Sequence, residues 1–471
     1  MNLKGLSYYL GLFCFPLSFF AFVNILYSSY FDYFLNLNSY VITMGLSLIL
    51  GLFFYFFGKN ANKKIDFYEQ IFLILLIYTV ISLLISIPYY LSNYQISFIN
   101  SLLESFSGIT GTGFSIFENI KYLDPTLILW RSSSQWIGGL YFLIFLILFF
   151  SNTQFNFKLN NLVFSDKSLN PETNIKKISL KISFLYIFLT ILIFILFSVS
   201  DIRLFNGLNL AMTIISTGGF LPTNSLSNII TNNTQEFFLV LSFLIPIFNI
   251  FFIYNLFTTK NILKNHYEDL FIILLIIILL IISLLFMNNL SILETLVNIL
   301  SSLGNFGIGI SKIEDNFSLF FLFIAMLGGS IISNTSGIKF LRIYILLKGS
   351  FIEIFKLVKP NNVVNQNILN SDKKIDDNNI KLSFLIFISF FISLFVLSGI
   401  LLLDNISFED SFKLSILTLT NTVNSELYGL ENIDFNNLLI SSKIFLIIFM
   451  IVGKIELISI FLIIKKAILK N

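Results

Sequence analysis

Long apolar runs alternate along the chain with shorter amphipathic runs. A helix that spans a membrane needs about 20 mostly apolar residues, and ten runs are of about this length. We expect the spans, in chain order, at Tyr9–Tyr27, Tyr40–Phe57, Glu69–Leu91, Thr126–Phe150, Ile178–Val199, Glu236–Phe257, Asp269–Met287, Ser318–Leu347, Leu382–Leu403 and Leu438–Ile464. The pattern predicts an all-α polytopic membrane protein with about ten transmembrane helices, the first two forming a leading pair.

Four shorter amphipathic runs lie between the later spans and are too short to cross a bilayer core of about 30 Å. Each begins at a polar residue that can cap a helix, and the four caps are expected at Ser97, Asp201, Ser291 and Ser407. Each ends in a polar loop, and the loops are Ser107–Ser115, Ile214–Phe220, Ser302–Gly309 and Leu419–Leu427. From cap to focal position the distances are 16, 17, 16 and 17 residues, where the focal positions are Gly113, Gly218, Gly307 and Asn424. This matched spacing indicates an internal repeat.

The repeats divide the chain into six parts. The expected ranges are 1–60 for the leading pair, 61–155, 156–260 and 261–355 for repeats 1 to 3, 356–381 for a cytoplasmic loop, and 382–471 for repeat 4. We expect each short run to enter the membrane and return as a re-entrant pore helix followed by a filter loop. Non-helical backbone at membrane depth survives where it is buried in protein or lines a water-filled path. Four such loops around one axis would provide carbonyl oxygens that replace the water shell of a cation; the alternative is that Gly and Thr merely permit close helix packing.

Composition and charge agree with a membrane protein. The chain is 56% hydrophobic and 12% charged, with a mean hydropathy of +0.88, which excludes a soluble protein. Of the 29 Lys and Arg, 22 fall on one side of the expected spans, six on the other side, and Lys454 within a span. The positive-inside rule then predicts a multi-pass membrane protein with both termini in the cytoplasm and the four loops facing outward. The expected location is the bacterial cytoplasmic (inner) membrane.

Two residue types bear on other kinds of site. The single cysteine, Cys14, excludes an internal disulfide and a cysteine-cluster metal site. The single histidine, His266, lies in a short basic connection, and we expect it to be a solvated loop residue.

Several stretches resemble one family. ITGTGFS and ISTGGF resemble its first two filter loops, and LWRSSSQWIGG (Leu129–Gly139) resembles the start of its first post-filter helix. LGGSIISNTSGIKFLR (Leu327–Arg342) resembles a glycine-rich break in its third post-filter helix, and VGKIELI (Val452–Ile458) resembles a stretch of its last helix. Along nearly its whole length the chain is similar to the membrane subunit of Trk-type potassium-uptake systems (the Trk/Ktr/HKT superfamily), and the leading pair fits the ten-span Trk branch.

The resemblance implies K⁺ uptake, with K⁺ as the transported ion and no organic cofactor. In the family, backbone oxygens just before each focal position line the filter. Carried across, the filter residues are Gly111, Thr112, Gly113, Ser216, Thr217, Gly218, Asn305, Phe306, Gly307, Thr422, Val423 and Asn424. The gating residues are the family's intramembrane cation, Lys454 here, and the loop residues Gly328, Gly329, Asn334 and Gly337. The resemblance also implies a homodimer with a cytoplasmic nucleotide-binding regulatory subunit (TrkA-like).

The departures from the family pattern leave alternatives open. Because Asn424 stands where the family has glycine, a less selective Na⁺/K⁺ transporter of the same fold is one alternative. A polytopic membrane enzyme is another, although such enzymes usually carry acidic or histidine clusters in their loops. For Lys454, we expect hydrogen bonds to the loop carbonyls and to Ser333–Ser336 in a closed state; the alternative is an ion pair with Glu456.

Overall fold

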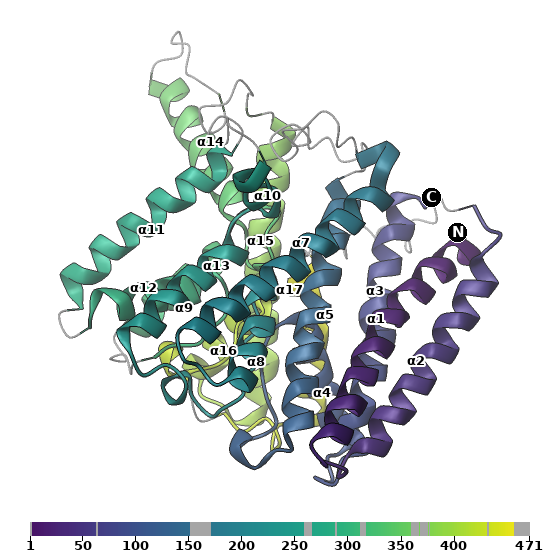
Figure 1. Cartoon of the computed structure of the whole chain (residues 1–471). Coiled ribbons are helices and arrows are strands. Elements are labelled where there is room, and N and C mark those ends of the chain that lie inside the picture. Colours follow the sequence, from purple (N-terminus) through teal and green to yellow (C-terminus); the bar gives the residue numbers. More distant parts are fainter. Residues whose placement is uncertain are drawn as a thin grey trace.

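The computed structural model describes residues 2–62, 65–150, 171–258, 266–287, 290–310, 317–358, 367, 375, 377–430 and 433–455. These residues are almost entirely helical (Figure 1). The longer helices are α1 (Leu3–Tyr30), α2 (Leu37–Gly58), α3 (Phe67–Tyr90), α5 (Pro125–Phe150), α7 (Pro171–Val199), α11 (Tyr267–Phe286), α14 (Phe340–Val358), α15 (Asp377–Leu401) and α17 (Ile440–Ile455). The shorter ones are α4 (Phe98–Thr110), α8 (Leu204–Ile215), α9 (Asn233–Ile247), α10 (Ile250–Thr258), α12 (Ile292–Leu303), α13 (Ser318–Leu327) and α16 (Phe408–Thr420).

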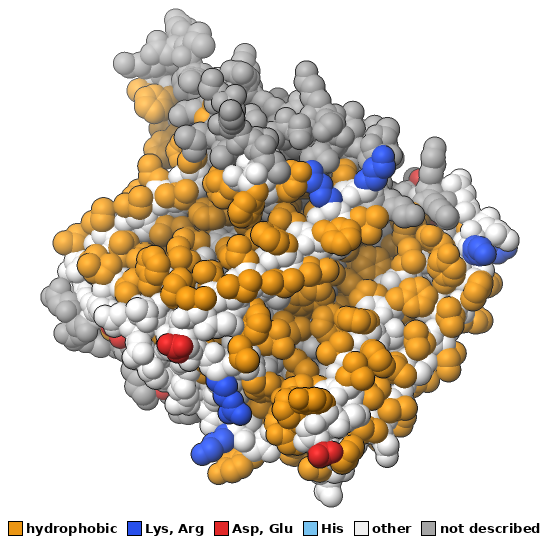
Figure 2. Space-filling view, viewed as in Figure 1, with side chains coloured by type: hydrophobic (Ala, Val, Ile, Leu, Met, Phe, Trp, Pro, Cys, Tyr) orange, Lys and Arg blue, Asp and Glu red, His pale blue; other side chains and the backbone are white. Residues whose placement is uncertain are grey.

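The long helices form an apolar outer wall. Within the described residues, six helices are long and apolar enough to cross a membrane: α1, α2, α3, α7, α11 and α15. Their outward faces carry large exposed apolar side chains, such as Phe53, Phe184 and Ile277, and Figure 2 shows a surface dominated by such side chains with charges confined mainly to its margins. The other four predicted spans correspond to α5, to the pairs α9–α10 and α13–α14, and to α17. The chain is thus an all-helical polytopic membrane protein.

One predicted span is broken where the sequence pattern indicated a continuous helix. The run Glu236–Phe257 does not form a single helix, because α9 and α10 meet at an angle of 112°. Pro246 lies inside α9, one residue before the helix ends at Ile247, and it lacks an amide proton for the helical hydrogen bond. Asn249 then forms the turn: its main-chain amide donates to Oδ1 of Asp269 (2.9 Å), and its own Oδ1 accepts from the amide of Phe251 (3.0 Å). The second break, between α13 and α14, lies in the glycine-containing stretch where it was expected.

The four short helices α4, α8, α12 and α16 form a closed ring. Each packs against the two spans of its own repeat, and each also contacts the helix that follows the short helix of the preceding repeat. The contacts between repeats are α8 with α5, α12 with α9, α16 with α13, and α4 with α17, the last of which closes the ring. The leading pair α1 and α2 lies outside this ring, at one edge of the bundle (Figure 1).

Three of the four predicted helix caps are present. Ser97, Ser291 and Ser407 each accept a hydrogen bond from the amide three residues on, which satisfies one of the free amides of the first helical turn. The fourth expectation is wrong: α8 begins at Leu204 with Arg203 as its N-cap residue. Asp201 belongs to the preceding turn, where its φ is +60°.

The expectation that His266 is solvated is also wrong, since only 2% of its surface is exposed. Its Nε2 lies 2.9 Å from Nδ2 of Asn255, and its Nδ1 lies 3.5 Å from the Asp269 carboxylate. The break after α9 explains this burial, because α10 turns there and brings Asn255 against the beginning of α11.

Candidate functional site

All four short helices end in the same turn. A residue in the left-handed conformation follows each helix or its last turn: Gly111 (φ +76°), Thr217 (+54°), Asn305 (+62°) and Asn421 (+49°). The amide of the next residue then bonds to the carbonyl oxygen five residues back in every case. The four bonds are Thr112 to Ser107 (3.0 Å), Gly218 to Thr213 (2.9 Å), Phe306 to Ser301 (2.9 Å) and Thr422 to Leu417 (2.9 Å). Four loops with one geometry confirm that the repeat is structural.

This common turn fixes which loop residues are equivalent. Counting from the left-handed residue, the third positions are Gly113, Gly219, Gly307 and Val423. Each lies 16 residues after the N-cap residue of its own short helix. In repeats 2 and 4 the structural register therefore differs by one residue from the Gly218 and Asn424 chosen from the sequence. The unequal sequence spacing came from choosing Asp201 instead of Arg203 in repeat 2, and from equating Asn424 with a glycine in repeat 4.

The third positions meet around one axis. A Cβ atom placed on Gly113 would lie 2.9 Å from Cα of Gly219, and one on Gly219 would lie 3.0 Å from the carbonyl oxygen of Phe306. A Cβ on Gly307 would lie 2.5 Å from the carbonyl oxygen of Val423. Gly113 and Gly307 also have φ values of +81° and +70°, a region that residues with a Cβ rarely adopt. The close approach of the neighbouring loops explains why glycine occupies these positions, and the positive φ values add a second reason at Gly113 and Gly307.

Asparagine side chains tie neighbouring loops together. Nδ2 of Asn305 donates to Oγ1 of Thr422 (3.2 Å), and Nδ2 of Asn421 donates to Oγ1 of Thr112 (3.0 Å). Asn421 also donates to the carbonyl oxygen of Met450 on α17 (2.9 Å). The sequence analysis missed Asn421, although an asparagine directly after a helix is a usual signal of a left-handed C-terminal turn.

A buried ion pair lies behind the first loop. Nε of Arg131 on α5 is 2.9 Å from Oε1 of Glu104 on α4, and neither side chain is more than 1% exposed. The carboxylate also accepts from the amide of Ile116 (2.9 Å), and the guanidinium donates to Oγ of Ser115 (2.9 Å). The guanidinium stacks on the ring of Phe220 at 4.1 Å, which links it to the second loop. This pair therefore fixes the chain directly after Gly113.

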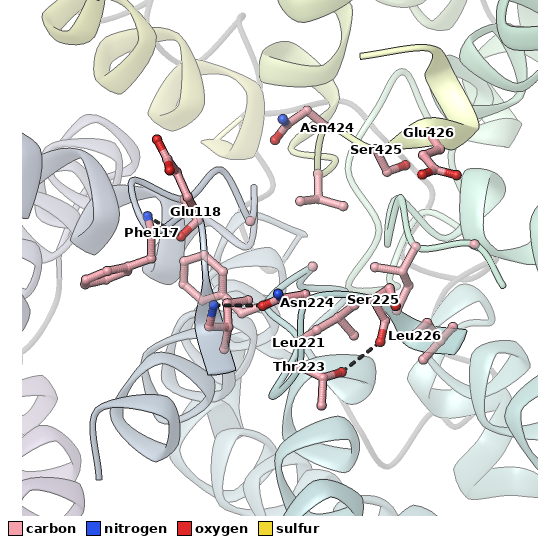
Figure 3. Close-up of a pocket in the computed structure, with 18 of the residues that line it drawn as sticks. Phe117, Glu118, Leu221, Thr223, Asn224, Ser225, Leu226, Asn424, Ser425 and Glu426 are labelled. Atoms are coloured by element: carbon pink, nitrogen blue, oxygen red, sulfur yellow. Dashed lines mark hydrogen bonds between the residues drawn. The ribbon is translucent and has the colours of Figure 1, made fainter. Parts of the chain in front are cut away.

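A cavity of about 760 Å³ lies on one side of the ring. Gly113, Gly219 and Val423 form part of its wall, so it opens directly onto the third positions. Figure 3 shows Glu118 and Glu426 at this cavity, on loops from different repeats. Asp434 also lines it. Such a concentration of carboxylates raises the local concentration of cations.

Lys454 lies on the opposite side of the ring and contacts the loop between α13 and α14. Its ammonium donates to the carbonyl oxygen of Asn334 (3.2 Å) and to Oγ of Ser336 (3.4 Å). These are contacts that the sequence analysis predicted for a closed state. Nζ lies 3.8 Å from the position that a Cβ on Gly111 would occupy and 4.5 Å from the centre of the Phe142 ring. Glu456, the alternative partner, is outside the described residues.

The same loop is fastened to the turns of repeats 2 and 3. Oγ1 of Thr217 donates to the carbonyl oxygen of Asn334 (3.1 Å), and Nδ2 of Asn334 donates to the carbonyl oxygen of Ile215 (2.6 Å). The amide of Ser336 donates to Oδ1 of Asn305 (3.0 Å). The loop therefore lies directly against the turns that end α8 and α12.

Main-chain hydrogen bonds join this loop to the break in the second repeat. The amide of Ser330 donates to the carbonyl oxygen of Ile247 (3.0 Å), and the amide of Ile250 donates to that of Ile332 (3.1 Å). The amide of Ile331 donates to Oε1 of Glu268 on α11 (2.9 Å). The two broken spans thus satisfy each other's backbone groups at membrane depth, where water is scarce.

The loop folds around the ammonium of Lys339, which the sequence analysis missed. Nζ of Lys339 contacts the carbonyl oxygens of Ser330 (3.3 Å), Ser333 (3.2 Å) and Thr335 (2.5 Å), and the hydroxyls of Ser333 and Thr335 (3.2 Å each). Gly328 and Gly337, at φ +62° and +77°, allow the chain to turn at both ends. The lysine provides the charge that organises these oxygens.

The chain is similar in sequence and in structure to known proteins. No protein-family model matches the chain. It is 26% identical over 413 residues to an uncharacterized cation transporter of Methanocaldococcus jannaschii, with 81% of this chain and 84% of that protein covered. It is 24% identical over 446 residues to the Trk system potassium uptake protein TrkG of Escherichia coli, with 90% of each covered. Its structure matches the potassium transporter TrkH of Vibrio parahaemolyticus with a TM-score of 0.81 at 20% identity, covering 98% of each chain. The chain has a TrkH-like fold.

The TrkH-like fold brings together most of the residues singled out from the sequence. The four loops converge at the ring, and Lys454 meets Asn334 beneath it. Glu104, Arg131 and Lys339 are additional residues of this site that the sequence analysis did not select. The ion pair of Glu104 and Arg131 has a signal in the sequence: Arg131 lies in a polar run inside an otherwise apolar span. A charge at membrane depth needs a partner.

Proposed function

We propose that this TrkH-like protein takes up K⁺ across the cytoplasmic membrane through the path between the four loops. The observation that carries the proposal is the convergence of four equivalent turns on one axis, with an acidic cavity on one side and a buried ammonium on the other. Main-chain carbonyl oxygens replace the water shell of a cation in such a path. The carbonyl ends of the four short helices point toward the same region and add a favourable negative potential.

In this proposal the filter is formed by the main-chain oxygens of the first two residues of each turn. In the structural register these residues are Gly111, Thr112, Thr217, Gly218, Asn305, Phe306, Asn421 and Thr422. They coincide with the assignment from the sequence in repeats 1 and 3 and are shifted by one residue in repeats 2 and 4.

The gate in this proposal is the loop between α13 and α14 together with Lys454. The loop occupies the inner side of the ring and is held there by Asn334 and Ser336. The Lys454 ammonium adds electrostatic repulsion against a cation that leaves the filter inward. Opening requires the loop to swing away, with Gly328, Gly329 and Gly337 as the residues that permit the change in backbone angles.

We further propose the orientation and assembly that the resemblance implies. The excess of Lys and Arg at the connections on one side supports an orientation with the acidic cavity outside and both termini in the cytoplasm. The name of TrkG describes it as part of a Trk system, and the resemblance to such systems implies a homodimer controlled by a cytoplasmic nucleotide-binding subunit. The six-part division of the chain given above is retained in this proposal.

Uptake of radioactive Rb⁺ by proteoliposomes tests the proposal. We expect uptake well above that of protein-free liposomes, and we expect external K⁺ to compete with Rb⁺ better than Na⁺ does. Equal competition by Na⁺ would support the less selective Na⁺/K⁺ alternative. Failure to exceed protein-free liposomes, together with failure to complement a bacterial strain that requires high potassium, would refute cation uptake and favour the membrane-enzyme alternative.

A further inference from the structure

The four equivalent third positions are not identical in the space they occupy. Three are glycines, and the fourth is Val423. Its Cβ and Cγ2 both lie 3.0 Å from the position that a Cβ on Gly113 would occupy, and its Cβ lies 2.4 Å from that position on Gly219. Its Cγ1 lies 2.8 Å from the corresponding position on Gly307. One isopropyl group therefore contacts the main-chain surface of all three other repeats.

Contact with three other repeats places the Val423 side chain at the centre of the ring. A side chain that packed behind its own loop would touch its own short helix and the adjacent span instead. Glycine leaves the centre of such a ring free, whereas valine fills it with a group whose χ1 angle is strongly restricted. Gly113, Gly219 and Val423 also line the outer cavity, so this constriction lies where the cavity meets the filter.

The neighbouring Asn424 does not have this position. It lines the outer cavity, and its Nδ2 donates to the carbonyl oxygen of Leu430 in its own loop at 3.4 Å. Its side chain is thus held at the cavity wall. The departure from glycine that matters for the path is therefore Val423.

We propose that Val423 is a specificity-determining residue, whose isopropyl group narrows the outer end of the filter and limits the size of the cation that passes. This inference rests on the proposed function, since it concerns the same path. The carbonyl oxygens below it replace the water shell of the ion, while the valine acts by steric exclusion at the entrance. A larger cation requires a larger displacement of the side chain from its preferred rotamer, and its passage is slowed more.

A series of substitutions at Val423 tests this inference by uptake of radioactive Rb⁺ and Cs⁺ into proteoliposomes. We expect Val423→Gly to raise the Cs⁺/Rb⁺ uptake ratio by about three- to tenfold. This factor corresponds to the energy needed to displace a side chain from its preferred rotamer, which Cs⁺ no longer has to supply. Val423→Ala, which removes both γ-methyl groups, should give a smaller increase in the same direction. Val423→Thr has nearly the same shape and should keep the wild-type ratio.

Asn424→Gly is the matched control, because it removes the neighbouring side chain of the same loop and should leave the ratio unchanged. Protein in the membrane is measured for each variant, and the ratio compares two ions on the same preparation. An unchanged ratio in both Val423→Gly and Val423→Ala would overturn the inference, as would an increase in Val423→Thr equal to that in Val423→Gly. These results presuppose Rb⁺ uptake by the wild type; its absence would instead refute the proposed function.

Discussion

Removing the charge of Lys454 provides the most direct test of the proposed gate. Its Nζ lies 3.8 Å from the Cβ position of Gly111, so a cation at the inner end of the filter would be roughly 5 Å away. At an effective dielectric constant of about 20, the repulsion over this distance is about 3 kcal/mol. A barrier lower by about 3 kcal/mol corresponds to a rate higher by a factor on the order of 100.

Lys454→Met keeps the length of the side chain and removes its charge. The loop still occupies the path in this variant, so we expect part of the full factor, an increase of about tenfold in basal Rb⁺ flux. Lys443→Met is the matched control: Lys443 is also a buried lysine of α17, but its ammonium contacts Asn100 and the Asn436 carbonyl, away from the gate loop. We expect this control to leave basal flux unchanged.

In the proposed gate, Lys454 and the loop between α13 and α14 form one barrier. A double substitution can test whether they do. Asn334→Ala removes the bond from Nδ2 to the carbonyl oxygen of Ile215 and should also raise basal flux. The combination with Lys454→Met should raise flux by less than the product of the two single effects, because Asn334 and Lys454 are in contact. A decrease of both flux and protein level in Lys454→Met would refute the proposed gate, since the lysine would then be a structural partner and the gate would lie elsewhere.

Three further predictions concern the surroundings of the ring. Gly218→Ser should lower Rb⁺ uptake without preventing membrane insertion, because its Cβ would displace the Gln135 amide, whose Oε1 accepts a hydrogen bond from the amide of Phe220 in the second loop; wild-type uptake would contradict this. Arg131→Met leaves the Glu104 carboxylate buried without its partner and should cost about 3–5 kcal/mol, seen as a lower melting temperature in detergent. Adding Glu104→Leu should recover part of that loss, and no recovery would contradict the ion-pair explanation. Lys339→Met should make the loop between α13 and α14 susceptible to protease, and full resistance would show that the lysine does not organise it.

The sequence predicts the elements that depend on local patterns. Apolar runs give the spans, and the serine caps give the beginnings of three short helices, because both depend on residues close together in the chain. The contact between Lys454 and the loop was also predictable, since a charge inside a span needs a polar partner and the broken helix supplies one. The break at Gly328 follows from the conformational freedom of glycine.

Other features depend on residues far apart and could not be assigned from one sequence. The break between α9 and α10 is stabilised by Asp269 and by the loop of the third repeat, so Pro246 alone did not indicate it. The position of Val423 in the ring becomes clear only when hydrogen bonds align the four turns. The sequence alone suggests that Asn424 is equivalent to the glycines of the other loops. The left-handed turn at Asn421 shows that Val423 is the equivalent residue.

The contact between α4 and α17, which closes the ring, can form only after nearly the whole chain has been synthesised. The first short helix, α4, packs against α17, and Asn100 near its beginning bonds to Asn436 and Lys443. Membrane proteins emerge from the ribosome from the N-terminus onward, so α4 enters the bilayer before its last neighbour has been synthesised. The hydrogen bond from Asn421 to Oγ1 of Thr112 likewise forms only after the fourth repeat has been synthesised. The loop Ser107–Ser115 is therefore translated before the other three loops, yet it acquires its last contacts only after they have been made.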